Sequence, residues 1–314
     1  METRRLGATG LAVSRLGLGT MTWGGDTDAD EASAQLDAFR DAGGTLVDTA
    51  YVYGDGAAET ILGDLLGGRH DRSELVIATK AGVTRSAGTI TRDASRRSLL
   101  DALDTSLRRL RLDHVDLWQL HAWDAAVPLE ETLAALDAAV ASGRTRYVGV
   151  SNYAGWQLGS AAAWQRAWPG RAPLASVQSE YSLLRRAVES SVLPACRHHG
   201  LGMLAWSPLA GGVLTGKYRG GVPADTRGAS GLWTEQVARY RADRGSHVVD
   251  AVVTAADGLG VSPLAVALAW VRDRSGVTAA VVGARTPAQL AASLDAERLR
   301  LPDEIRQALD DVST

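Results

Sequence analysis

Short apolar runs return along this chain, most of them at intervals of about thirty residues, the length of one strand–helix unit in an α/β barrel. Each run ends in a polar or small residue, and apolar residues between the runs recur at helical spacing. The runs occupy residues 15–19, 45–48, 75–80, 115–121, 147–151, 175–178, 203–206 and 277–283. The helical patterns occupy residues 30–41, 95–110, 129–141, 153–167, 188–197 and 246–258, with one more from residue 262 onward.

Strands that alternate with helices indicate parallel βα units, and eight of them predict an α/β fold, the closed (β/α)8 TIM barrel. No linker or low-complexity tract divides the chain, so we expect one domain over residues 1–314. Residues 6–14, with turns at Gly7 and Gly10, predict an N-terminal β-hairpin that closes the barrel bottom. The glycine-rich segment from 207 to about 245 predicts a long binding loop or lid after strand seven. A C-terminal helix completes the expected fold.

A doubly wound open sheet is the main alternative fold. To bind a dinucleotide it would need a Gly-x-Gly-x-x-Gly turn after its first strand. Residues 17–22 read GLGTMT, which lacks the third glycine. This weakens the alternative without excluding it.

The composition narrows the class of partner. A hydrophobic content of 46% and a charged content of 22% are typical of a soluble globular protein. The net charge of −3 argues against nucleic acid or an anionic membrane as partner. We find no signal peptide and no apolar run of the ~18 residues that a membrane span needs. Cys196 is the only cysteine, which fits a reducing cytoplasm, and we expect a cytoplasmic location.

Ionisable side chains stand at the ends of the predicted strands, where barrel enzymes place their active sites. Asp48, Lys80 and His121 end three consecutive strands, and Tyr53 follows Asp48 in the next loop. Taken singly, Asp48 could cap a helix, Lys80 could be solvated and His121 could be a hydrogen-bonded core residue. Together they bring an acid, a phenol, an ammonium and an imidazole to one end of the barrel. Such a set suits proton donation to a carbonyl oxygen.

Lysine is scarce in this chain, because Lys80 and Lys217 are the only two. Codon bias is one explanation; the other is that lysine is kept where a compact ammonium is needed. Tyrosine is a poor acid, with a reference pKa of about 10, and a nearby ammonium lowers that value. We therefore expect Lys80 to lower the pKa of Tyr53, Asp48 to keep Lys80 charged, and His121 to orient the carbonyl or share the proton. A general acid whose pKa lies near the working pH accelerates a reaction by a factor on the order of 10²–10⁴.

Motifs in order along nearly the whole chain resemble the signatures of the aldo-keto reductase family. They are DTAYVYG at 48–54, Lys80 after its strand, DLWQLH at 116–121, GVSN at 149–152, QSEY at 178–181, WSPL at 206–209 and GARTP at 283–287. The resemblance implies a (β/α)8 barrel that uses NADPH, less often NADH, to reduce aldehydes and ketones. It implies Tyr53 as proton donor, with Asp48, Lys80 and His121 completing a catalytic tetrad.

The resemblance also assigns a cofactor site. Ser151, Asn152 and Gln178 would hydrogen-bond the nicotinamide carboxamide, and Trp206 would stack on the nicotinamide ring, although Trp206 could instead be a core aromatic. The pyrophosphate would lie along residues that offer close backbone approach and a point charge, namely Ser207, Leu209, Gly211 and Lys217. The remaining expected cofactor contacts are Gly19, Thr20, Met21, Pro208, Gly283, Arg285 and Gln289.

Arg285 bears on the choice between NADPH and NADH. By the resemblance it would face the adenosine 2′-phosphate, and because a guanidinium fork suits phosphate we expect NADPH. An ordinary solvated arginine is the alternative. The chain departs from the family after Gln289, where an acidic residue and then asparagine commonly contact adenine. Here Ala292 and Ser293 stand in that region, so we expect adenine to be held more loosely or by other residues and the preference for NADPH to be less strict.

Two other motifs suggest other chemistry only weakly. Residues 211–217 fit the first seven positions of an ATP-binding P-loop, but Tyr218 stands where a Mg²⁺-binding Ser or Thr belongs. Cys196, His198 and His199 lie on one predicted helix without a partner cluster, so we assign no metal site.

The expected partner is a small-molecule carbonyl substrate. Trp23 and Trp123 are candidates for the walls of its pocket and would favour an apolar or aromatic substrate, although both could be loop packing. Some members of the family are redox-sensing regulatory subunits of channels that bind the cofactor and turn over slowly. The residue pattern leaves this role open, along with the oligomeric state.

Overall fold

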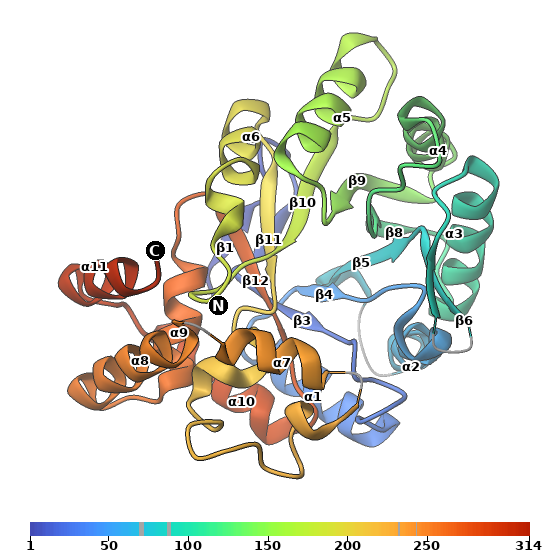
Figure 1. Ribbon diagram of the computed structural model, residues 1–314. Coiled ribbons are helices and arrows are strands. Elements are labelled where there is room, and N and C mark those ends of the chain that lie inside the picture. The colour runs from blue at the N-terminus through green and yellow to red at the C-terminus, as the bar shows by residue number, and fades with distance from the viewer. Residues whose placement is uncertain (69–71, 87–88, 232, 243) are drawn as a thin grey trace.

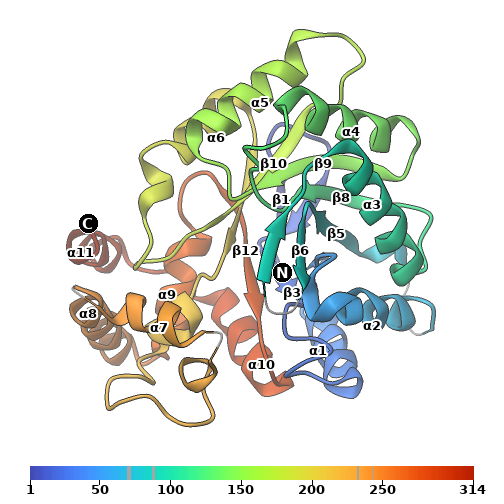
Figure 2. The same ribbon diagram turned by 45° about the vertical axis from the view of Figure 1, so that its right-hand side comes forward.

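Eight parallel strands form a closed barrel in the computed structural model, which describes residues 1–68, 72–86, 89–231, 233–242 and 244–314 (Figures 1 and 2). The strands are β3 (Leu16–Gly19), β4 (Leu46–Asp48), β5 (Val76–Ala81), β8 (Val115–Leu120), β9 (Thr145–Ser151), β10 (Leu174–Glu180), β11 (Gly202–Trp206) and β12 (Val277–Gly283). The expected (β/α)8 barrel is confirmed. Pairing of β12 with β3, where Val281 lies opposite Gly17, closes the ring and excludes the open sheet.

Helices surround the barrel, as Figures 1 and 2 show. They begin where the sequence supplies capping residues: Asp28 and Glu31 form a reciprocal capping box, and Ser262 caps a helix that opens with Pro263. The helices are α1 (Ala29–Asp41), α2 (Ala57–Leu66), α3 (Arg96–Leu110), α4 (Leu129–Ala141), α5 (Gly155–Ala167), α6 (Val192–His199), α8 (Gly245–Leu259), α9 (Pro263–Arg272), α10 (Pro287–Asp295) and α11 (Asp303–Val312). The pattern at 188–197 is corrected to a short 3-10 turn followed by α6.

The inward faces of the strands determine which side chains reach the site. Leu46, Ala78, Leu117 and Leu204 pack in one cluster inside the barrel. Side chains two residues apart on a strand share a face. Asp48, Lys80 and Trp206 each follow a member of this cluster by two residues, so they too point inward, at the carboxyl ends of their strands.

The N-terminal hairpin differs in its bounds from the expected one. Its strands are β1 (Thr3–Arg5) and β2 (Ala12–Ser14), and the turn lies between them. Leu6 lies between the two strands, and its side chain packs in the cluster inside the barrel. A second hairpin, β6 (Val83–Ser86) and β7 (Thr89–Arg92), follows β5 and has no apolar alternation that would have predicted it.

The segment after β11 is more structured than the expected loop. It contains a 3-10 helix (Ala210–Thr215), a second short one (Arg227–Ala229) and α7 (Thr234–Arg241). The Tyr240 hydroxyl on α7 donates to Glu180 at the end of β10, which ties the segment to the barrel. Helix α7 was not predicted because only two of its side chains, Val237 and Tyr240, are buried.

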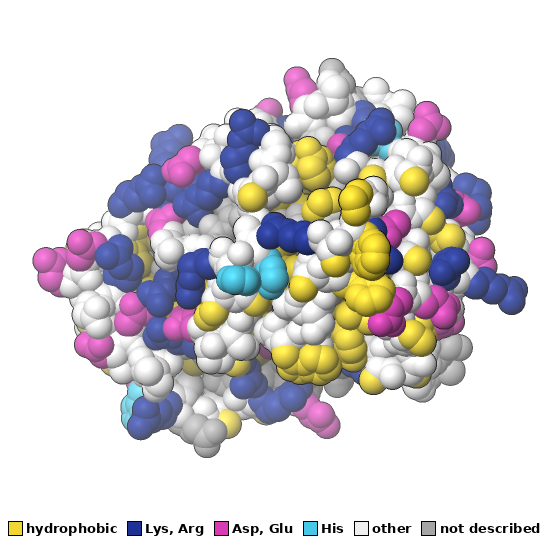
Figure 3. Space-filling view, turned by 90° about the horizontal axis from the view of Figure 1, so that it is seen from above, with side chains coloured by type: hydrophobic (Ala, Val, Ile, Leu, Met, Phe, Trp, Pro, Cys, Tyr) yellow, Lys and Arg dark blue, Asp and Glu magenta, His cyan; other side chains and the backbone are white. Residues whose placement is uncertain are grey.

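Among the described residues no single helix has the length and hydropathy of a membrane span. Helices α8 and α9 meet that test only as a pair, across a bend of 103°. On the face seen in Figure 3, acidic and basic side chains are interspersed around a group of hydrophobic ones.

Candidate active site

Tyr53, Lys80 and Asp48 form a connected group at the carboxyl end of the barrel. The Lys80 ammonium donates to the Asp48 carboxylate, with Nζ 2.7 Å from Oδ2, and to the Tyr53 hydroxyl at 3.3 Å. It also donates to the carbonyl of Thr49 at 3.0 Å. Lys80 and Asp48 are 1% and 2% exposed, whereas Tyr53 is only partly buried. The ion pair is therefore shielded from water, whereas part of the Tyr53 residue reaches the surface.

The pKa of Tyr53 corrects one sequence-based expectation. Burial raises the pKa of the phenol, the Lys80 ammonium lowers it, Asp48 raises it, and the net shift is upward. Burial likewise opposes the Lys80 charge, but Asp48 and Tyr53 outweigh it, and the pKa of Lys80 is raised. Because burial raises the pKa of Tyr53 by more than the Lys80 ammonium lowers it, Tyr53 keeps its proton at neutral pH and can donate it.

His121 is a neutral partner in this group. Burial, assisted by the charge of Lys80, lowers the pKa of the imidazole to about 3. Its ring meets the Tyr53 ring edge to face, with centroids 5.9 Å apart. Its Nδ1 is buried without a hydrogen-bond partner in the described residues. A neutral imidazole beside the phenol can hydrogen-bond a carbonyl oxygen without competing for the proton.

Asn152, Gln178 and Trp206 join the tetrad through hydrogen bonds. Gln178 Nε2 donates to Asp48 Oδ1 at 2.8 Å. The Asn152 amide donates to the His121 carbonyl at 3.0 Å, and its oxygen accepts from the Trp206 indole at 3.0 Å. The predicted nicotinamide residues thus lie beside the predicted catalytic ones. Ser151 lies within this network, since its hydroxyl accepts from the Asn152 amide at 3.1 Å.

Left-handed backbone conformations concentrate beside these residues. Asn152, Ser207 and Ala210 have φ values of 58°, 53° and 48°, which residues other than glycine rarely adopt. Strained backbone of this kind clusters at ligand sites. The predicted cofactor residues Pro208 and Leu209 lie within this stretch.

The glycine-rich turn after β11 forms a cradle that suits a phosphate group. Gly211 and Gly212 have φ values of 65° and 88°. A Cβ at Gly212 would lie 2.9 Å from the Lys217 Nζ, so the ammonium rests directly over the backbone there. The Gly211 amide donates to the Ser207 hydroxyl at 3.3 Å. These residues fit the pyrophosphate of a dinucleotide cofactor.

The P-loop alternative is wrong on geometry. A P-loop leads into an α-helix whose N-terminus faces the phosphates. Here Ala210–Thr215 is a 3-10 helix, and Lys217 follows it in a turn. In the part of the chain that the structure describes, no group of three or more His, Cys, Asp or Glu side chains could hold a metal ion. Cys196 is a buried free thiol whose pKa burial raises to about 12.

Arg285 and Gln289 lie together where β12 ends. The Arg285 amide donates to the Gln289 side chain at 3.0 Å, and its guanidinium donates to the Asp225 carbonyl at 2.6 Å. Arg227, which the sequence did not suggest, belongs to the same place: burial lowers the pKa of its guanidinium, Asp26 opposes this, and the charge of Arg285 adds to the lowering. The charges of Arg227 and Arg285 thus act on each other, with the Asp26 carboxylate acting on Arg227 as well, and guanidinium groups of this kind suit an anion.

The other expected cofactor residues line the ends of β3 and β12. Gly19 and Gly283 lie opposite each other in the strand register, and Thr20 donates through its amide to the Asp48 carbonyl at 3.0 Å. Met21 follows them, partly exposed. The Ser293 side chain is buried and donates to the Gln289 carbonyl at 3.2 Å, whereas Ala292 is exposed.

The two predicted pocket walls differ in their surroundings. Trp23 is 0% exposed and its indole nitrogen donates to Gln35 on α1 at 3.1 Å, so it packs in the core rather than lining an open surface. Trp123 is partly exposed and meets Tyr153 and Trp156 edge to face, with centroids 5.2 and 5.5 Å away. Trp156, at the start of α5, is 66% exposed. The sequence analysis missed Tyr153 and Trp156, although both closely follow Asn152.

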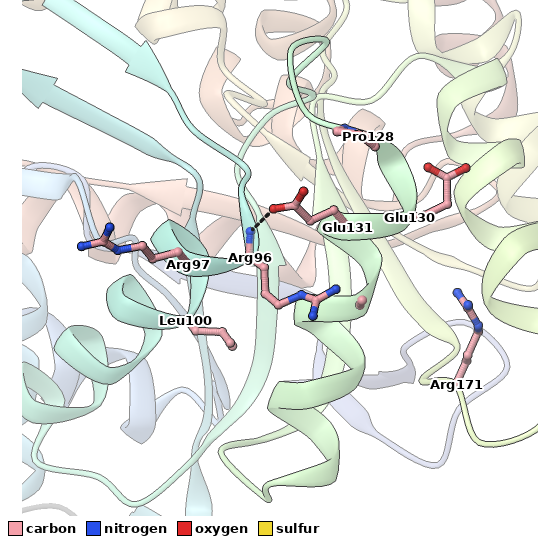
Figure 4. Close-up of a pocket in the computed structure, with 8 residues that line it drawn as sticks. Arg96, Arg97, Leu100, Pro128, Glu130, Glu131 and Arg171 are labelled. Atoms are coloured by element: carbon pink, nitrogen blue, oxygen red, sulfur yellow. Dashed lines mark hydrogen bonds between the residues drawn. The ribbon is translucent and has the colours of Figure 1, made fainter.

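A separate surface hollow of about 860 Å³ lies between α3 and α4 (Figure 4). Glu131 accepts there from the Arg96 amide at 3.1 Å, and charges of both signs surround it. Its lining residues are Arg96, Arg97, Leu100, Pro128, Glu130, Glu131, Ala134 and Arg171. None of the predicted site residues is among them.

Comparison with known proteins shows the family to which the chain belongs. The Aldo/keto reductase family matches residues 15–314. An "Uncharacterized oxidoreductase YrpG" of Bacillus subtilis is 38% identical over 99% of this chain and 96% of its own length. A "Probable voltage-gated potassium channel subunit beta" of Oryza sativa is 37% identical over 94% of this chain and 91% of its own. The "Aldo-keto reductase YhdN" of Bacillus subtilis is 33% identical over 93% and 87%. The fold, the arrangement of the site and these matches together support an oxidoreductase function, and the chain belongs to the aldo/keto reductase family.

Proposed function

We propose that this protein is an NADPH-dependent carbonyl reductase that converts a small aldehyde or ketone into an alcohol. The observation that carries the proposal is the Lys80 ammonium, which lies 3.3 Å from the Tyr53 hydroxyl and is held in place by a buried carboxylate. When bound, NADPH supplies the hydride for the carbonyl carbon. The residues of the chain supply the proton, the orientation and the exclusion of water.

Tyr53 donates its phenolic proton to the carbonyl oxygen. The phenolate left behind is stabilised by Lys80, whose charge is in turn held by Asp48. The upward net shift in the pKa of Tyr53 keeps the donor protonated before reaction. Lys80 thus acts on the charge that develops during proton transfer, which is the charge that catalysis must stabilise.

His121 orients the carbonyl group. With its pKa lowered to about 3, the imidazole is neutral across the physiological range. A neutral ring can donate one hydrogen bond to the carbonyl oxygen while Tyr53 delivers the proton. We assign His121 orientation rather than proton transfer for this reason.

NADPH fits better than NADH because of the basic site at the end of β12. Arg285 and Arg227 are suited to a 2′-phosphate, which NADH lacks. Ser151, Asn152 and Gln178 would hold the carboxamide, Trp206 would cover the ring, and Lys217 would face the pyrophosphate. Ala292 and Ser293 leave adenine without the family's usual acidic and amide partners.

The substrate that suits this site is a small carbonyl compound with an apolar or aromatic substituent. Trp123, with Tyr153 and Trp156 packed against it, presents aromatic surface two residues after His121 in the chain. Such surface favours apolar groups because their burial removes them from water. We further expect a cytoplasmic location, which suits a free buried thiol such as Cys196.

Loss of NADPH absorbance over a panel of aldehydes, ketones and keto-sugars tests the proposal directly. The Tyr53→Phe variant should bind NADPH as the wild type does and lose most of the reduction. Equal rates in the two proteins would remove Tyr53 as the acid. If NADH supports reduction as well as NADPH does, the assignment of Arg285 is wrong.

A regulatory role is the second candidate, because relatives at 37% and 35% identity are named as probable channel β-subunits. A subunit of that kind would bind NADPH and turn over slowly. Purified protein that retains NADPH and oxidises it with none of the carbonyls in the panel would favour this role. Turnover of many molecules of NADPH per protein would favour the reductase.

A further inference from the structure

Glu59 is a buried carboxylate on α2 that is linked both to the strand of Lys80 and to the loop of Tyr53. Its side chain is 0% exposed, on the first turn of α2. A buried charge is costly unless it is paired and hydrogen-bonded. The helix N-terminus favours the negative charge, and two side chains complete its partners: Thr79 and Arg109.

The first partner belongs to the strand that carries Lys80. The Thr79 hydroxyl donates to Glu59 Oε1 at 2.6 Å. Thr79 precedes Lys80 on β5, so the two side chains point to opposite faces of the strand. Glu59 therefore holds β5 from the helix side at the residue next to the ammonium.

The second partner belongs to the loop that carries Tyr53. Arg109 Nη1 donates to Glu59 Oε2 at 3.1 Å and to the Tyr51 carbonyl at 2.9 Å. The guanidinium also lies over the Tyr51 ring, 4.6 Å from its centroid. One arginine thus fixes both the backbone and the side chain of a residue two positions before Tyr53.

Two glycines make this arrangement possible. Gly56 has a φ of 99°, and a Cβ there would overlap the Arg109 guanidinium. A Cβ at Gly63 would overlap the backbone of Arg109 itself, so glycine allows α2 and α3 to approach closely enough for the pair to form. The Tyr53 loop is consequently packed directly onto the Glu59–Arg109 pair.

We infer that Glu59 is a positioning residue that sets the distance between the Tyr53 hydroxyl and the Lys80 ammonium. It acts through Thr79 on the strand of Lys80 and through Arg109 on the loop of Tyr53, and it touches neither substrate nor cofactor. The inference rests on the proposed role of Tyr53 as proton donor. A small misplacement of a reacting group costs on the order of 10²-fold in rate, so this distance matters to turnover.

The Glu59→Gln variant tests the inference, because glutamine can still accept from Thr79 but no longer pairs with the Arg109 charge. We expect kcat to fall about 10- to 100-fold while the Kd for NADPH changes less than about two-fold. The alkaline limb of the kcat profile should move to higher pH, because a weaker contact with Lys80 raises the pKa of Tyr53. A limb that moves to lower pH would overturn the inference, since simple loss of a negative charge has that effect.

Glu297→Gln is the matched control. Glu297 pairs with the buried Arg15, with Nε 2.7 Å from Oε1, next to the first residue of β3 at the opposite end of the barrel. This variant should lose thermal stability without any change in the pH profile. If both variants lower kcat equally with unchanged profiles, Glu59 is merely structural and the inference fails.

A second variant and a second measurement keep the outcomes separate. Should Glu59→Gln fail to fold, Thr79→Val cuts only the link to β5 and should move the alkaline limb in the same direction. Titration of the phenol by ultraviolet difference absorbance, with Tyr53→Phe as reference, reports the pKa of Tyr53 without turnover. A wild type that reduces no carbonyl refutes the proposed function, whereas an unchanged phenol titration in Glu59→Gln refutes this inference alone.

Discussion

Gln178 donates its side-chain amide to Asp48 across the barrel, with Nε2 2.8 Å from Oδ1. The two residues lie on β10 and β4, which are not neighbours in the sheet. Asp48 also accepts from Lys80, so its two oxygens join a predicted cofactor residue to the ammonium that contacts the predicted proton donor, Tyr53. With one N–H of Gln178 donated to Asp48, its carbonyl oxygen can accept from a carboxamide.

The Gln178→Leu variant should therefore weaken both functions. Removal of a hydrogen bond to a buried carboxylate costs about 1.5–3 kcal/mol, so we expect the Kd for NADPH to rise and kcat to fall, each by about ten-fold. Fluorescence titration and steady-state rates measure the two effects. Gln165→Leu is the control, because Gln165 donates in the same way to Asp137 on α4, away from the site. A Gln178 variant with unchanged Kd would remove it from the cofactor site.

His121 should make stability depend on pH in the acid range. Its pKa is about 3 in the folded protein and near 6.5 in the unfolded chain, so the unfolded state takes up the proton first. Stability is then complete above pH 6.5 and declines as the pH falls from there towards 3. Thermal melts should show a shallower decline for His121→Gln than for the wild type. His114→Gln should change the slope less, because burial lowers the pKa of that imidazole by less than it lowers the pKa of His121; identical slopes in all three proteins would contradict the assignment.

Arg285→Leu should reduce the preference for NADPH over NADH. Charge-assisted hydrogen bonds to a phosphate contribute about 1.5–3 kcal/mol, so the Kd for NADPH should rise roughly 10- to 100-fold and that for NADH should hardly change. Arg227→Leu should act in the same direction. The exposed Arg239 on α7 provides the control, since Arg239→Leu removes a charge from the segment after β11 that also carries Arg227. Equal losses for both cofactors in Arg285→Leu would argue against a 2′-phosphate contact.

Trp156→Ala should lower kcat/KM for aryl aldehydes more than for short aliphatic ones. An aromatic pair is worth about 0.5–1.5 kcal/mol, which predicts a loss of about three- to ten-fold for the aryl substrates. Trp168→Ala is the matched control, because Trp168 is 62% exposed at the other end of α5, roughly 18 Å away along the helix. If the two variants behave alike, Trp156 does not line the substrate site.

Much of the barrel could be predicted from local pattern. All eight expected strands are present, because a parallel strand buried on both faces needs a short apolar run and a helix must follow it to cover the sheet. The additional elements were not predicted because they lack such buried apolar runs. Helix α7 and the β6–β7 hairpin bury little apolar surface and so carry no periodic signal.

The order of residues along the chain by itself determined which side chains reach the carboxyl end of the barrel, because strand alternation and parallel direction are local properties. Tertiary structure decided the rest. Trp23 is a core residue whose indole donates to Gln35. The pKa of Tyr53 rises because burial raises it by more than the Lys80 ammonium lowers it. Glu59 meets Arg109 only because α2 and α3 pack closely. Such properties depend on solvent exclusion and on contacts between distant segments, which exist only once the barrel has closed.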